Sequence, residues 1–169
     1  MLVVPAEMRS AALAPELERS APSRPVEDET WGGVDWQRLW LSVQRHPWRT
    51  LALVPAGLGA PRELTLDAAV ALARTGSLQF GAHIHVADAT ELEFSDMADF
   101  VAQLRETLAS GPVILALAPA AASPATVQLA RSSDLALLCV ALERMRIGEA
   151  KRTLDDIGRE RFFGAVTFA

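Results

Sequence analysis

From residue 50 to the end of the chain, short uninterrupted apolar runs alternate with longer segments whose apolar residues repeat at helical spacing. A run such as 113–117 has no polar face, so it predicts a strand buried on both sides. Strands that alternate with helices are typical of a parallel sheet covered on both faces. We therefore expect an α/β fold, doubly wound, with a parallel sheet of about five strands. The expected strands are 50–54, 83–87, 113–117, 135–142 and 162–168.

The first thirty residues differ in composition from the rest. Prolines interrupt them repeatedly and an acidic run closes them at 27–29. Such a segment predicts a flexible arm over residues 1–30. Residues 31–169 then form a single domain, and because half of the 169 residues are hydrophobic, the chain is able to bury one sizeable core.

Four tryptophans lie between residues 31 and 48. Trp36 and Trp40 belong to an apolar stripe that predicts a helix, with Asp35 as its N-cap and Pro47 beyond its end. We expect these two rings to face the core. Trp31 and Trp48, at the two ends of the segment, are the candidates for contact with a partner protein.

Charge and cysteine content exclude several classes of protein. A net charge of −5 argues against nonspecific nucleic-acid binding, which needs clustered cations. No apolar run is long enough to span a bilayer, and the N-terminus lacks the basic region of a secretion signal. The lone Cys139 excludes an internal disulfide and lies in an apolar run, so we expect a small buried hydrophobe. These features together fit a cytoplasmic protein.

A glycine-bearing loop connects the first strand to a helical segment at 64–75, for which Gly76 is the expected end. Gly57 and Gly59 in this loop have the setting of a phosphate-binding P-loop, between a strand and a helix. The chemistry of such a loop needs a lysine on the phosphates and a hydroxyl on magnesium. Lys151 is the only lysine in the chain and lies far from the loop in sequence.

Several segments between residues 35 and 169 resemble, in order and spacing, the deviant-Walker P-loop ATPases of the ParA/MinD type. They are nearest to the bacterial tyrosine-kinase (BY-kinase) modules of exopolysaccharide and capsule synthesis. The segments that carry the resemblance are Arg-Thr-Leu-Ala-Leu-Val-Pro-Ala-Gly (49–57), Ala-Val-Ala-Leu-Ala-Arg-Thr-Gly (69–76), Ile-His-Val-Ala-Asp (84–88), Val-Ile-Leu-Ala-Leu-Ala-Pro (113–119), Ala-Arg-Ser-Ser-Asp-Leu-Ala-Leu-Leu (130–138) and 157–168. The resemblance implies a P-loop NTPase-like sheet and a nucleotide site at Gly57, Gly59, Arg62, Thr65 and Asp88.

The chain differs from the family at the positions that bind phosphate and magnesium. Pro61 stands at the lysine position, and Ala116 stands where an aspartate would hold the magnesium shell. Asp88 matches the family's second acidic residue, although an aspartate at a strand end also commonly caps the following turn. Each lost element removes on the order of 3 kcal/mol of transition-state stabilisation. The chain also has no tyrosine, so it cannot carry the C-terminal phosphorylated cluster of a BY-kinase.

These observations favour a non-catalytic pseudo-ATPase with no cofactor, which acts as a binding or regulatory partner. One alternative is a residual nucleotide-binding ATPase or kinase that uses ATP and Mg²⁺ through Arg62, Thr65 and Asp88. The other is a module phosphorylated on Asp88, but 54–55 and 168–169 supply neither the acidic pair nor the lysine of a receiver.

The resemblance also implies the partners: a component of envelope polysaccharide synthesis or an active homologous ATPase, bound in the cytoplasm or at the inner face of the membrane. Self-association is left open. Arg144 and Arg146, with Lys151 and Arg152, form a basic cluster that is either a solvated face or a docking patch for an acidic partner. His83 and His85 face one side of a strand, but no third ligand is near, so no metal site is expected.

Overall fold

The computed structural model describes residues 9–10 and 34–169 of the chain. In this part, a six-stranded sheet has the order β1-β3-β4-β2-β5-β6, with β1 antiparallel to β3 and the other five strands parallel. The strands are β1 (Arg9–Ser10), β2 (Thr50–Pro55), β3 (His85–Ala89), β4 (Val113–Leu117), β5 (Leu135–Ala141) and β6 (Phe162–Phe168). The prediction of a five-stranded parallel α/β sheet is confirmed, and its architecture is consistent with a P-loop NTPase-like fold. The predicted flexible arm lies outside the described residues, apart from β1.

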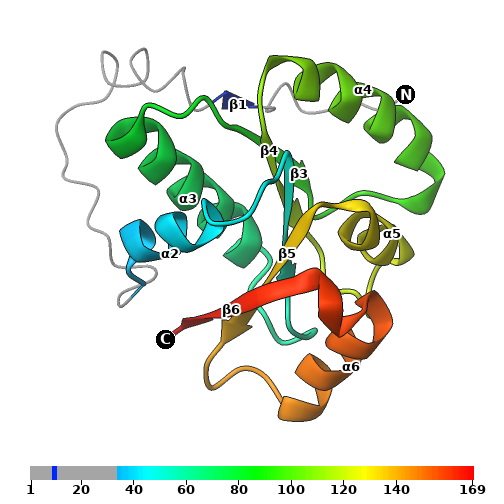
Figure 1. Cartoon of the computed structure of the whole chain (residues 1–169). Coiled ribbons are helices and arrows are strands. Elements are labelled where there is room, and N and C mark those ends of the chain that lie inside the picture. The colour runs from blue at the N-terminus through cyan, green and yellow to red at the C-terminus, as the bar shows by residue number, and fades with distance from the viewer. Residues whose placement is uncertain (1–8, 11–33) are drawn as a thin grey trace, which may run out of the picture.

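Helices cover both faces of the sheet (Figure 1). One face carries α2 (Trp36–Val43) and α3 (Leu64–Phe80), and the other carries α4 (Met97–Ser110), α5 (Pro124–Ser132) and α6 (Ile147–Ile157). Two 3-10 turns precede α4 and β6, at Phe94–Asp96 and Arg159–Arg161. None of the helices in the described ranges has both the length and the apolarity needed to cross a membrane.

The central strands are buried along almost their whole length, as their continuous apolar runs predict. Every residue of β4 is buried, and β2 is buried from its second residue onward. Each face of the sheet then has its own apolar core, built from alternate strand residues and the helices above them.

Helix α2 begins and packs as its sequence predicts. The Asp35 side chain accepts a hydrogen bond from the Arg38 N–H (3.0 Å), which satisfies one unpaired donor of the first turn. Trp40 is 1% exposed and Trp36 is half-buried against Phe168, at 6.2 Å between ring centroids. The helix ends at Val43, before Pro47.

The predicted end of the next helix is wrong. Helix α3 continues through Gly76 and ends at Phe80, and Gly81 caps it with a φ of 65°, the left-handed conformation that glycine adopts readily. Gly76 serves another purpose, because a Cβ at this position would lie 2.6 Å from the Trp40 ring. The glycine therefore allows α2 to approach α3 closely. The predicted strand 83–87 is likewise displaced and begins at His85.

Candidate functional site

The residues predicted to form a nucleotide site follow the carboxyl ends of the parallel strands. Asp88 in β3 pairs in register with Ala116 in β4, which pairs in turn with Leu53 in β2. The loop after β2 and the turn after β3 therefore lie at the same edge, as the resemblance implies. This edge is where open parallel α/β sheets bind their ligands.

The glycine loop itself is covered by another part of the chain. A Cβ at Gly57 would overlap the Glu149 side chain, and a Cβ at Gly59 would overlap the carbonyl oxygen of Arg144. Both covering residues belong to the connection between β5 and the first turn of α6. The two glycines thus allow oxygen atoms of the protein itself to approach the loop closely. In the family that the chain resembles, the corresponding loop contacts phosphate instead.

The covering connection has a left-handed residue at its start. Glu143 has a φ of 68° and is the one non-glycine residue in the described part with a positive φ. The preceding Leu142 N–H donates to the Phe168 carbonyl oxygen at 2.7 Å, which extends the pairing of β5 and β6 by one bond. These two features turn the chain away from the sheet and back over the glycine loop.

Two buried threonine hydroxyls hold the loop region to the fold. Thr65 in the first turn of α3 donates to the Leu117 carbonyl oxygen at 2.9 Å, and Thr153 in α6 donates to the Ala56 carbonyl oxygen at 3.0 Å. The Thr65 hydroxyl, predicted as a nucleotide contact, therefore binds the end of β4. Thr153 fixes α6 against the end of β2.

Replacing Thr65 with valine is expected to lower the free energy of unfolding by about 1–2 kcal/mol, because the buried bond to Leu117 is lost. Thr65→Ser is the matched control, since it keeps the hydroxyl and should cost less than the valine variant. Urea unfolding of the two variants measures the difference. A serine variant that loses as much stability as the valine variant, or more, would contradict the prediction, because the methyl group would then contribute no less than the hydrogen bond.

The two charged candidates already have partners. Arg62 pairs with Glu91 at 3.2 Å, and both side chains are at least 80% exposed, so the pair contributes little stability. The Oδ1 atom of Asp88 accepts from both the N–H and the hydroxyl of Thr90, at 3.0 and 2.7 Å. Asp88 therefore has the turn-capping role that an aspartate at a strand end commonly has.

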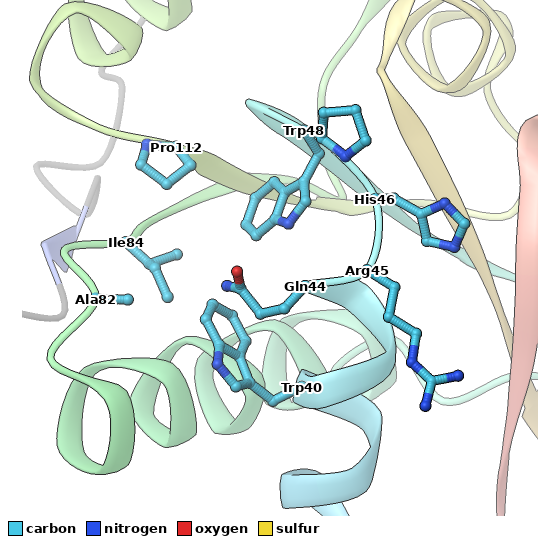
Figure 2. A pocket seen from close by; sticks show the side chains of 9 residues that line it. Trp40, Gln44, Arg45, His46, Trp48, Ala82, Ile84 and Pro112 are labelled. Atoms are coloured by element: carbon cyan, nitrogen blue, oxygen red, sulfur yellow. The ribbon is translucent and has the colours of Figure 1, made fainter.

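The remaining predicted residues do not join this site. Trp31 lies outside the described residues. Trp48 is half-buried at the opposite, amino edge of the sheet, where its ring meets Trp40 edge to face at 6.2 Å. Figure 2 shows both rings, with Gln44 between them, in a pocket of about 390 Å³ whose wall includes Ile84. A second hollow, of about 700 Å³, runs along α5.

The histidines and the cysteine carry no sign of a metal or nucleophilic site. The rings of His83 and His85 are in contact at 4.8 Å between centroids, and His85 also hydrogen-bonds the Ser110 hydroxyl at 2.9 Å. Burial and the neighbouring His83 both lower the pKa of His85. No group of three potential metal ligands occurs within residues 34–169 or at 9–10. Cys139 is fully buried, and burial raises the pKa of its thiol, as expected for a small core residue.

Glu149 and Thr153 are the residues of this edge that the sequence does not reveal. Glu149 reads as one charge among the basic residues of 144–152, and nothing in its spacing indicates contact with Gly57. Arg144 and Arg146 themselves are exposed, at the same edge as the loop.

None of the protein-family models, curated proteins or solved structures compared with the chain matches it.

Proposed function

We propose that this chain is a non-catalytic module built on a P-loop NTPase-like scaffold, and that its surfaces, not a nucleotide site, carry its function. The observation that carries this proposal is the Glu149 side chain packed onto Gly57. A phosphate-binding loop attracts an anion, whereas here a carboxylate already lies against the loop. Two negative charges at 4 Å repel by about 4 kcal/mol in a partly buried setting.

The other candidate contacts support the same proposal. The Thr65 hydroxyl is bound to Leu117, and Arg62 is bound to Glu91. A nucleotide would have to break both interactions and displace the connection over Gly59, without a P-loop lysine to compensate. A role in envelope polysaccharide synthesis, beside an active homologous ATPase or another component, is supported by the sequence resemblance alone.

Calorimetric titration with ATP and Mg²⁺ tests the proposal. We expect no saturable heat up to millimolar nucleotide, hence a Kd weaker than about 1 mM, equivalent to less than about 4 kcal/mol of binding free energy. Glu149→Gln is a matched variant, because it removes the charge but keeps the shape of the side chain. This variant should also bind no nucleotide, because it lacks the P-loop lysine as the wild type does.

A micromolar Kd for the wild type, lost in Asp88→Ala, would overturn the proposal. It would favour the residual ATPase that uses Arg62, Thr65 and Asp88.

A further inference from the structure

The two edge strands of the sheet differ in how they are protected. They are β1, which is two residues long, and β6, which is seven residues long (Figure 1). Proteins protect an exposed edge strand by keeping it short or by placing a proline, a charge or a bulge in it. Strand β6 reads Phe-Phe-Gly-Ala-Val-Thr-Phe, without proline or charge, and its register shift against β5 lies at its start, opposite Ala136 and Leu137. From Gly164 onward, β6 is therefore a long edge strand without such protection.

The backbone groups on the outer side of β6 belong to Ala165 and Thr167. The Phe168 carbonyl oxygen accepts a hydrogen bond from the Leu142 N–H at 2.7 Å, so the backbone groups of Phe168 face β5. In a parallel strand, the N–H and C=O of one residue point to the same side, and this side alternates along the strand. The groups of Val166 therefore also face β5, and those of Ala165 and Thr167 point away from the sheet. No strand within residues 9–10 and 34–169 pairs with this outer side.

The side chains of β6 leave room for a further strand. Ala165 and Thr167 are exposed, and both are small. Val166 is half-buried and packs on the face of the sheet that α2 covers, where Trp36 lies against Phe168. A second strand can therefore approach the outer side of β6 without displacing a large side chain of the edge.

We propose that β6 pairs with β6 of a second copy of the chain, in antiparallel orientation, with Val166 on the two-fold axis. In this register, Ala165 of each copy lies opposite Thr167 of the other, and each such pair exchanges both of its N–H···O=C bonds. The two Val166 side chains then face each other in a non-hydrogen-bonded pair, where β-branched residues pack closely. The two sheets become one continuous sheet, and the interface is isologous.

The chemistry of β6 favours a second copy as the occupant. Ala165 and Thr167 lie two positions apart, so the outer side of the strand is complementary to itself when one copy is reversed. The strand is uncharged, and the exposed Arg161 that precedes it lies at opposite ends of the antiparallel pair, roughly 30 Å from its counterpart. Because the other edge strand, β1, is short, the assembly ends at a dimer and does not continue through further sheets.

A cysteine on the two-fold axis tests the register. Val166→Cys brings two thiols into the range of a disulfide, so mild oxidation of the full-length protein should give a cross-linked dimer. Ala165→Cys is the matched control. Ala165 is more exposed than Val166, but its counterpart lies two positions further along the facing strand, so its cross-linking should be about tenfold weaker. The native Cys139 is fully buried and should not react.

Proline at position 167 tests the backbone pairing. The Thr167 N–H points outward, so Thr167→Pro removes a hydrogen bond to the second copy and none to β5. We expect the wild type to sediment as a dimer and Thr167→Pro to dimerise at least tenfold more weakly, whereas Thr167→Val keeps the N–H and should dimerise like the wild type. Raising the salt concentration should leave the wild-type dimer intact, because β6 carries no charge. Circular dichroism checks that each variant folds.

Three results would overturn the proposal. The first is a wild type that stays monomeric up to its solubility limit, which would leave the edge to an extended segment of another protein. The second is a dimer that Thr167→Pro does not weaken, and the third is equal cross-linking of the two cysteine variants. If Thr167→Pro fails to fold, the cysteine variants decide alone. None of these results depends on nucleotide binding at the glycine loop, so this proposal and the proposed function can fail separately.

Discussion

Replacing Trp40 with alanine is expected to lower the free energy of unfolding by about 3–5 kcal/mol. Trp40 is 1% exposed and its ring lies 6.2 Å, centroid to centroid, from both Trp48 and Phe80. Its indole N–H has no hydrogen-bond partner in the part of the chain that the structure describes. The loss therefore comes from packing, since the side chain fills the space between α2 and Gly76 of α3. Urea unfolding followed by circular dichroism measures it.

Trp48→Ala is the matched control for this prediction. Trp48 contacts the same ring but is half-buried and forms part of the open pocket in Figure 2, so its loss should be clearly smaller. Equal losses of stability in the two variants would contradict the prediction that packing around Trp40 contributes more to the core than packing around Trp48.

The strands of this fold can be predicted from the sequence because their burial leaves a local trace. In a parallel sheet covered on both faces, a run such as Val113–Leu117 has no polar position, and that pattern is visible without any tertiary contact. The end of α3 cannot be read in the same way. Glycine is typical of the end of a helix, which is why Gly76 is predicted to end α3. Its actual role depends on Trp40, which approaches it from another helix.

The location of the candidate site can be predicted from the sequence, but the covering of its loop by another segment cannot. The order of strands and loops indicates that Asp88 and Gly57 share an edge, because parallel strands bring their carboxyl ends together. The covering of that edge by Glu149 and the Arg144 carbonyl group depends on a contact between segments distant in sequence. One of these groups is a backbone atom, which has no residue-type signature at all.

Replacing Asp134 with alanine is expected to lower the free energy of unfolding by about 2 kcal/mol, because a charged acceptor loses several hydrogen bonds. The Oδ2 atom of Asp134 accepts from the N–H groups of Arg49 and Thr50, each at 2.8 Å, and from the Thr50 hydroxyl at 3.0 Å. The Asp134 N–H in turn donates to the Thr50 hydroxyl at 2.9 Å. These bonds join the start of β5 to the start of β2, so the substitution loosens two central strands where they begin.

The stability that Asp134 supplies should also depend on pH in a defined direction. Partial burial acts to raise the pKa of Asp134, but the hydrogen bonds from Arg49 and Thr50 and the charge of Arg49 lower it below its ordinary value. A carboxyl whose pKa is lowered by folding stabilises the protein fully above its unfolded pKa, about 3.9, and loses that contribution as the pH falls through the folded pKa. The stability difference between wild type and Asp134→Asn should therefore be constant from about pH 7 to 5 and shrink below about pH 4. Asp99→Asn, at an exposed position in the first turn of α4, is the control, and a difference for Asp134 that persists unchanged at low pH would mean that its charge does not contribute.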